Sequence, residues 1–236
     1  MRVDVAFTPE EVPAAPVAVV VDVLRATSTI AQALASGYRR VYCCREVEDA
    51  LALREKLGEG LLGGERSAVR IEGFDIGASP REVLEPQGET LIYSTTNGTR
   101  AVLAAASACP VVVLGSLLNL SAVAAAVQDD CVIVCAGFQG QFALDDAYCA
   151  GRIVELLDGE VTDAAKASAL LARSFSTAHQ ALLARTYGPP GLEEDIRFCA
   201  QVDMVDVVPR LSRMVGSAAE IIRSRPTSLD IERVFV

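Results

Sequence analysis

The stretch VAVVVDVLRATSTI, residues 17–30, decides how the chain folds. A run of β-branched residues ends at an acidic loop residue, and small helix-forming residues follow directly, which predicts a strand, a tight turn and a helix. The same alternation continues along the chain. Short apolar runs lie near residues 17–23, 40–43, 61–62, 90–93, 111–114 and 132–135. This pattern predicts an α/β fold with a largely parallel sheet.

The predicted strands are almost continuously hydrophobic, as strands are when helices cover both faces of a sheet. We therefore expect a layered α/β/α arrangement. From about Asp145 onward the pattern becomes mostly helical, so the C-terminal third is expected to consist mainly of helices. Because a typical domain has about 150 residues, we expect residues 1–236 to form a single α/β domain.

A second stretch, TLIYSTTNGT at residues 90–99, repeats the order of strand, threonine-rich turn and helix. Strand, helix and strand follow each copy, which gives two βαβαβ halves at about residues 17–66 and 88–140. An ancestral duplication and the ordinary periodicity of α/β chains both explain this pattern. In either case we expect the two turns to meet at the carboxyl edge of the sheet, where hydroxyl and N–H groups at helix N-termini bind anions.

Composition excludes several classes of protein. With 21 basic and 31 acidic residues the net charge is −10, so no basic face is available for nucleic acid. His179 is the only histidine, which argues against metal centres built from several imidazoles. The seven cysteines lie mostly in apolar runs without a C-x-x-C pair, as expected of reduced thiols in a cytoplasmic protein. Pro110 and Gly115 interrupt the uncharged segment 101–128, so we expect no membrane span.

Acids and arginines gather at the loops that follow the predicted strands. Carboxylates bind Mg²⁺ together with phosphate oxygens, and guanidinium groups suit phosphate, carboxylate or sulfonate. Each residue also has an ordinary interpretation as a helix cap or a surface salt bridge. The acids are Asp22, Glu65, Asp75 and the pair Asp145–Asp146, and the arginines are Arg25, Arg66 and Arg100. Together they predict a site for a polyanionic substrate bridged by a metal ion.

Five motifs occur in an order that resembles the 2-phosphosulfolactate phosphatase family over essentially the whole chain. They are DVLRATST at 22–29, GGER at 63–66, GFDIGASP at 73–80, TTNGT at 95–99 and CAG at 135–137. Two positions depart from the family pattern, because Ala78 replaces an expected asparagine and Asp145 an expected glutamate. The resemblance implies an α/β fold and a Mg²⁺-dependent hydrolase that converts 2-phospho-3-sulfolactate into sulfolactate and phosphate, a step toward coenzyme M.

Within that class the candidate residues take three roles. We assign catalysis to Asp22, Glu65 and Asp146, and metal binding to these three and Asp75. Substrate binding is assigned to hydroxyl, amide, glycine and arginine residues of the same motifs: Arg25, Thr27, Ser28, Arg66, Ser79, Thr96, Asn97, Gly98, Thr99 and Arg100.

Several alternatives stay open. A metal-activated water could attack phosphorus, or Asp22 could form an aspartyl-phosphate; Leu24 stands where haloacid-dehalogenase chemistry needs a second aspartate, which favours water. The substrate could be another phosphorylated 2-hydroxy acid, and a non-catalytic anion-binding protein could use the same turns. A nucleotide-binding transferase is disfavoured because the glycine-rich fingerprint is missing. The apolar composition leads us to expect a homo-oligomer, most simply a homodimer.

Overall fold

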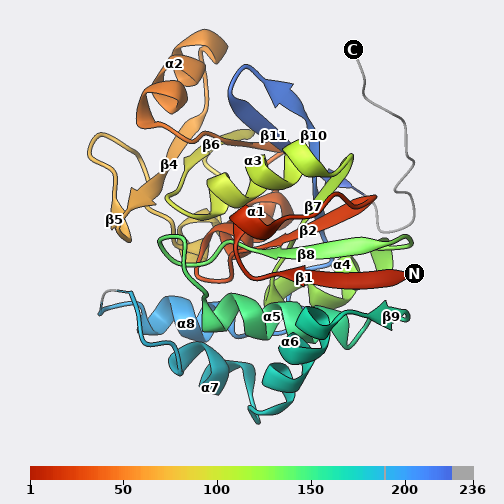
Figure 1. The fold of residues 1–236 in the computed structure, drawn as a ribbon. Coiled ribbons are helices and arrows are strands. Elements are labelled where there is room, and N and C mark those ends of the chain that lie inside the picture. Colours follow the sequence, from red (N-terminus) through yellow and green to blue (C-terminus); the bar gives the residue numbers. More distant parts are fainter. Residues whose placement is uncertain (189, 225–236) are drawn as a thin grey trace.

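The computed structural model describes residues 1–188 and 190–224, and one large sheet runs through it between two layers of helices (Figure 1). The strands are β1 (Arg2–Ala6), β2 (Val17–Val21), β3 (Arg40–Cys43), β4 (Leu61–Arg66), β5 (Val69–Arg70), β6 (Thr90–Ser94), β7 (Val111–Gly115), β8 (Cys131–Cys135), β9 (Glu160–Val161), β10 (Val208–Val215) and β11 (Ala218–Ser224). The α-helices are α1 (Ala26–Ser36), α2 (Val47–Leu57), α3 (Gly98–Ala108), α4 (Leu120–Ala126), α5 (Leu144–Val154), α6 (Asp163–Arg173), α7 (Ala178–Leu183) and α8 (Glu193–Cys199). Short 3-10 helices are η1 (Pro9–Glu11), η2 (Pro80–Val83) and η3 (Leu117–Asn119). The expected α/β layers are confirmed.

The strand order of the sheet is β5-β4-β6-β3-β11-β10-β7-β2-β8-β1-β9. Two blocks within it are parallel, one made of β4, β6 and β3 and the other of β7, β2, β8, β1 and β9. The strands of the two sequence halves are interleaved, because β2 lies between β7 and β8 while β6 lies between β3 and β4. The sheet is therefore largely parallel, and the turns after β2 and β6 occupy equivalent places in the two blocks.

The last two strands correct the prediction of a mostly helical C-terminal third. Helices α5 to α8 are present, but β10 and β11 then return to the middle of the sheet as an antiparallel hairpin. β11 is antiparallel to β3 and β10 is antiparallel to β7, so the two parallel blocks run in opposite senses. Both strands mix apolar and charged residues and are only partly buried. This half-buried pattern is overlooked when strands are sought as continuous apolar runs.

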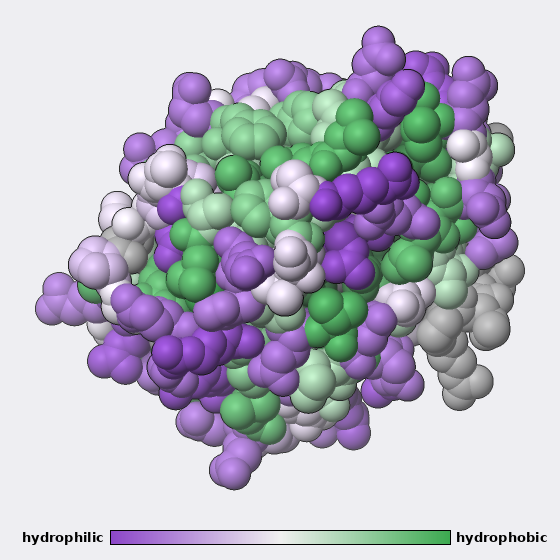
Figure 2. Space-filling model, turned by 90° about the horizontal axis from the view of Figure 1, so that it is seen from below, coloured by the Kyte–Doolittle hydropathy of each residue, from purple (hydrophilic) through white to green (hydrophobic). Residues whose placement is uncertain are grey.

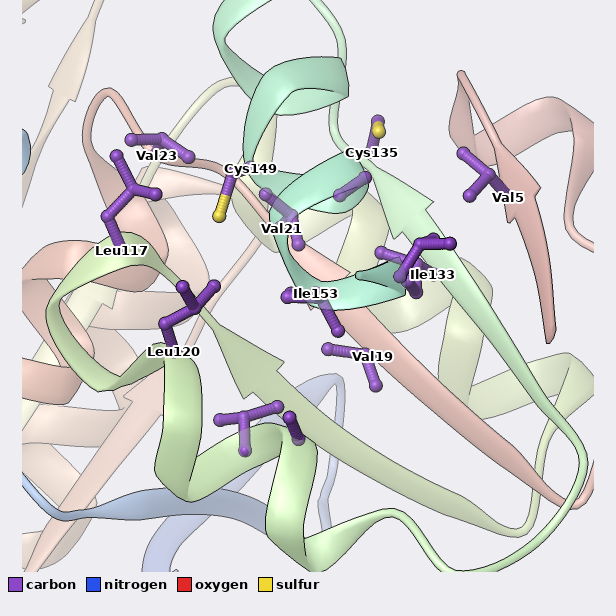
Figure 3. Close-up of a cluster of buried hydrophobic side chains, with 14 of the residues drawn as sticks. Val5, Val19, Val21, Val23, Leu117, Leu120, Ile133, Cys135, Cys149 and Ile153 are labelled. Carbon is purple, nitrogen blue, oxygen red and sulfur yellow. The ribbon is translucent and has the colours of Figure 1, made fainter. Parts of the chain in front are cut away.

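Side chains of the central strands pack into separate cores on the two faces of the sheet. Val19 and Val21 of β2 lie beside Ile153 of α5 (Figure 3), whereas Val20 belongs to the core that includes Ile30 of α1. Every residue of β2 is buried. Because successive side chains of a strand point to opposite faces, both cores hold β2 in register and thereby fix the position of residue 22 at its end.

The seven cysteines are free and buried, as expected for reduced thiols. Burial raises the pKa of the Cys44, Cys131 and Cys199 thiols to about 12. A thiol with such a pKa stays protonated at neutral pH and is a poor nucleophile. The cysteines therefore act as small core residues rather than as reactive groups.

The face seen from below in Figure 2 lies on the side of α6 and α7, and hydrophobic side chains gather over its upper and central part with hydrophilic ones around them. Leu170 of α6 and Leu183 of α7 are exposed. These residues are available for a contact between subunits, and the homodimer stays a prediction. Among residues 1–188 and 190–224, every helix falls short of the length and apolar character needed to cross a bilayer.

Candidate active site

A cavity of about 300 Å³ lies where β2, β4 and β6 end. Its wall combines the turns after β2 and β6 with the end of β4 and with residues that follow β8 and α7. The lining residues are Asp22, Leu24, Arg25, Ala26, Glu65, Ser67, Ala68, Ala78, Thr95, Thr96, Asn97, Phe138, Gln139, Asp145, Arg185, Tyr187, Gly188 and Leu192. The two threonine-rich turns therefore meet in one site.

The turn after β2 is held by its own hydroxyl groups. The Thr27 hydroxyl donates to the carbonyl of Asp22 at 2.9 Å and accepts the Asp22 N–H at 3.0 Å. The Ser28 hydroxyl donates to the carbonyl of Val23 at 2.8 Å, and Oδ1 of Asp22 accepts the N–H of Ala26 at 3.2 Å. Thr27 and Ser28 are buried away from the cavity wall. The structure therefore places these two predicted substrate-binding residues where they shape the turn that presents Asp22.

The turn after β6 lies directly against Asp22. A Cβ atom at Gly98 would lie 2.7 Å from Oδ2 of Asp22 and would overlap the Cβ of Ala26. Only glycine allows this approach, because any other residue adds that atom. Thr99 lies behind the wall, where its N–H donates to the Thr95 hydroxyl at 3.2 Å. Gly98 and Thr99 thus bring the turns together rather than lining the cavity themselves.

Replacing Gly98 with alanine is expected to lower kcat by roughly 100-fold, because the added methyl group displaces the Asp22 carboxylate by a fraction of an ångström or more. Overpacking at such a contact also costs about 1–3 kcal/mol of stability. Turnover and the melting temperature would be measured for G98A and for S107A, a change on the exposed side of the same helix α3. Unchanged kcat in a folded G98A protein would contradict the expected close contact.

Glu65 connects β4 to the turn after β6. Its Oε1 accepts the N–H of Thr96 at 2.8 Å, and its Oε2 accepts the N–H of Ala68 at 2.6 Å. Asn97, the next residue of the turn, accepts the N–H of Gln139 on its side-chain oxygen at 3.3 Å. These bonds hold Thr96 and Asn97 at the cavity wall, where both were predicted to contact substrate.

Three carboxylates line the cavity: those of Asp22, Glu65 and Asp145. Burial raises the pKa of Asp22 to about 7; the hydrogen bond from Ala26 opposes this rise, and the charges of Asp145 and Glu65 add to it. Burial also raises the pKa of Asp145, against a hydrogen bond from Tyr187. The three carboxylates thus place negative charge in a buried site where water screens it poorly. Binding of a cation or a proton would reduce the repulsion between them.

Asp146 lies behind the wall, although the sequence analysis assigned catalysis and metal binding to it. Its side chain accepts the N–H of Val23 at 2.9 Å and that of Gly137 at 3.0 Å. Burial, followed by the charges of Asp145 and Asp22, raises its pKa well above the usual range. Adjacent residues on a helix point about 100° apart, so only one member of the pair faces the cavity. That member is Asp145, which the sequence analysis had not assigned.

Two of the three predicted arginines lie outside the cavity wall. Arg66 donates to the Ser94 hydroxyl at 2.9 Å and to the carbonyl of Arg45 at 2.8 Å, which ties the ends of β4 and β6 together. Arg100 forms an ion pair with Glu10 at 3.4 Å. The structure therefore does not bring Arg66 and Arg100 to the substrate cavity.

Asp75 also lies away from the cavity, where it accepts the N–H of Leu62 at 2.8 Å and pairs with Arg54 at 3.4 Å. Its side chain is 42 % exposed. We therefore expect D75N to leave kcat/KM within about threefold of the native value and to cost at most about 1 kcal/mol, as for an exposed ion pair. Steady-state kinetics and thermal unfolding would measure both. A metal-dependent loss of activity in D75N would restore the assignment of Asp75 as a ligand.

Arg25 belongs to a buried network that the sequence did not indicate. Its Nη1 lies 2.7 Å from Oδ2 of Asp195, and its Nη2 donates to the carbonyl of Ala68 at 3.2 Å. The Ser79 hydroxyl donates to the other oxygen of Asp195 at 2.6 Å. Ser79, predicted to bind substrate, therefore positions Arg25 through Asp195. Asp195 is 170 residues from Arg25 along the chain, and no motif in the sequence links them.

Aromatic and basic residues from the helical region complete the wall. The Tyr187 hydroxyl donates to Asp145, and the Tyr187 ring stacks on Phe138 with 4.6 Å between centroids. Arg185 lines the cavity from the same segment. The sequence analysis missed these residues, because the segment between α7 and α8 matches none of the motifs.

The carboxylate oxygens at the cavity wall are the protein groups that could bind Mg²⁺. Among residues 1–188 and 190–224, no group of three or more His, Cys, Asp or Glu side chains is arranged to hold a metal ion without help. Mg²⁺ commonly takes only one or two protein carboxylates and completes its shell with water and substrate phosphate. Asp22 and Asp145 meet that smaller requirement, because both are buried at the cavity and each pKa is raised. Asp22 and Asp145 are the residues that would hold Mg²⁺, and its binding stays a prediction.

Comparisons with known proteins agree over nearly the whole chain. A family model described as 2-phosphosulpholactate phosphatase matches residues 6–214. A protein of Caldanaerobacter subterraneus subsp. tengcongensis is 44% identical over 82% of this chain and 86% of its own length. Proteins of Carboxydothermus hydrogenoformans and Thermus thermophilus are each 39% identical, over 89% and 92% of this chain and 92% and 98% of their own lengths. All three carry the name "Probable 2-phosphosulfolactate phosphatase". With this length of agreement, and with four of the five motifs contributing residues to one cavity wall, the chain belongs to the 2-phosphosulpholactate phosphatase family.

Proposed function

We propose that this chain is a phosphoric monoester hydrolase that converts 2-phospho-3-sulfolactate and water into sulfolactate and phosphate with the help of Mg²⁺. The observation that supports this most directly is that Asp22, Asp145 and Arg25 share one cavity in a chain of this family. The protein as a whole carries a net charge of −10, so a polyanionic substrate needs a local source of positive charge. Arg25 and a bound cation supply it.

Asp22 would hold Mg²⁺, with Asp145 beside it and the substrate phosphate and water completing the shell. When bound there, Mg²⁺ supplies Lewis-acid stabilisation of the phosphoryl oxygens and a more acidic water. Arg25 orients the phosphate, because Asp195 and the Ala68 carbonyl hold its guanidinium in place.

Asp145 is our assignment for the group that accepts the proton of the attacking water. Burial raises its pKa, which makes this carboxylate a stronger proton acceptor than an exposed aspartate. Tyr187 orients this carboxylate through its hydroxyl. We favour direct attack by water over an aspartyl-phosphate, because Leu24 stands where a second aspartate would be needed to support Asp22 as nucleophile.

The test is phosphate release from 2-phospho-3-sulfolactate and from a panel of phosphorylated 2-hydroxy acids, each with Mg²⁺ and again with EDTA. We expect release that requires Mg²⁺ and favours the sulfonate. If phosphate is released only from the other esters, the protein is still a phosphatase, but its substrate is one of those esters. Binding of these anions without any release would support the non-catalytic alternative.

The proposal also covers the cellular location and the oligomeric state of the protein. We place the enzyme in the cytoplasm as a homodimer, in line with its seven unpaired cysteines and the exposed leucines of α6 and α7. Size-exclusion chromatography with light scattering would test the dimer.

A further inference from the structure

The cavity contains a second guanidinium that the proposed mechanism does not use. Arg25 and Arg185 are the two basic residues among those lining the cavity. Arg25 is paired with Asp195, and the side chains in this pair are 10% and 9% exposed. Arg185 is held differently, because Nη1 donates to the backbone carbonyl of Tyr187 at 2.5 Å. Within the described part of the chain no carboxylate lies within ion-pair distance of Arg185, although its charge acts on Asp145 and opposes the rise of that pKa.

The backbone around Arg185 is shaped to hold the guanidinium at the wall. Gly188 has φ +91°, and a Cβ atom there would overlap Nη1 of Arg185. The next anchor is Tyr187, whose ring stacks on Phe138 and whose hydroxyl donates to Asp145. Arg185 lies two residues before Tyr187, whose ring and hydroxyl both contact residues of the cavity wall.

We propose that Arg185 binds the sulfonate of the substrate and is the residue that distinguishes it from phosphate esters without a second strong anion. This inference rests on the proposed function. In 2-phospho-3-sulfolactate the carboxylate shares its carbon with the phosphate ester, whereas the sulfonate is attached one carbon further away. In the proposed arrangement the phosphate lies near Asp22 and Arg25, and the longer sulfonate arm extends toward Arg185 on the same cavity wall. The planar fork of arginine matches two oxygens of such a group.

The proposal is tested by comparing R185Q with the native protein on three esters. These are 2-phospho-3-sulfolactate, 2-phospholactate, which keeps the carboxylate, and glycerol 2-phosphate, which has neither acid group. We expect kcat/KM of R185Q to fall about 100-fold on the sulfonate ester, the loss typical of a hydrogen bond to a charged group, and by a much smaller and equal factor on the other two, because Arg185 also acts on Asp145. R185K should lie between, because it keeps the charge and loses the fork. R197Q is the matched control, an exposed arginine on α8 outside the cavity wall.

Calorimetric binding of sulfolactate and of lactate to both proteins gives a second readout that does not depend on turnover. Arg185 is expected to raise affinity for sulfolactate alone, so R185Q should bind the two acids about equally. An equal loss on all three esters would assign Arg185 to the phosphate or carboxylate and overturn the proposal, as would an unchanged preference for sulfolactate in R185Q. If the native protein hydrolyses none of the esters, the proposed function fails, while the calorimetric comparison still decides the role of Arg185.

Discussion

Replacing Asp22 with asparagine is expected to reduce turnover on the order of 10³-fold while making the metal-free protein more stable. On the proposed mechanism the change removes the charge that would hold the cation, and metal-assisted charge stabilisation contributes several kcal/mol to such reactions. The gain in stability follows from burial. The folded protein raises the pKa of Asp22 to about 7 from 3.8, so above pH 7 folding must bury an ionised carboxylate.

The titration of Asp22 determines whether D22N is more or less stable than the native protein at a given pH. Between about pH 4 and 7 the folded state holds a proton on Asp22 that the unfolded state has released, so this contribution to stability is lost as pH rises through the folded pKa. The native protein should therefore lose stability relative to D22N between pH 5 and pH 8. We expect D22N to be more stable at pH 8 by at least about 1 kcal/mol, or roughly 2–4 °C in melting temperature. The gap should narrow as pH falls toward 5 and close only below about pH 4, under the pKa of the unfolded carboxyl.

Thermal unfolding at pH 5 to 8, with EDTA and with Mg²⁺, would measure both effects. Mg²⁺ should raise the melting temperature of the native protein and leave that of D22N nearly unchanged, because a ligand stabilises only a state that binds it. D75N is the matched control, an aspartate outside the cavity that should behave like the native protein in both series. An active D22N protein, or one that is destabilised at pH 8, would contradict this account of Asp22.

Replacing Arg25 with methionine is expected to produce the largest loss of stability, about 3–5 kcal/mol. The change leaves Asp195 buried, with only its Ser79 bond and a distant contact to Arg81 at 3.9 Å. Breaking a buried ion pair on one side costs this much because the remaining charge has lost its partner. For a chain of this size the melting temperature should fall by roughly 10 °C. Turnover should fall with it, because Arg25 also lines the cavity.

A double-mutant cycle separates the charge from the packing. D195N in the R25M background should recover part of the lost stability, because it removes the unpaired carboxylate. R197M is the control for an exposed pair with Glu194 and should cost less than about 1 kcal/mol. Urea unfolding of the native protein, R25M, D195N, the R25M/D195N double mutant and R197M would give the free energies. Equal losses in R25M and R197M would contradict a stabilising role for the buried pair.

Strands β2, β3, β4, β6, β7 and β8 could be predicted from sequence, because their runs are mostly apolar. β1 and β5 were missed, because charged residues interrupt the one and the other is only two residues long. The two threonine-rich turns do meet, but not for the expected reason, because β2 and β6 belong to blocks that run in opposite senses. The hairpin of β10 and β11 was not predictable, since its partners β3 and β7 lie far away in sequence and its own pattern is only half buried. Strand order likewise depends on which edges pair, and no local pattern encodes that choice.

For the site, the sequence by itself determined the chemistry: acids and arginines on loops after parallel strands, in motifs of one family. The tertiary structure decided which of them face the cavity. It brought Asp145 to the wall and placed Asp146 behind it, and it left Asp75 and Arg66 outside. It also joined Arg25 to Asp195 across 170 residues, and Val23 to Asp146 across 123. Local sequence sets a residue's type and its secondary structure, whereas the direction in which a side chain points depends on packing between segments that only folding brings together.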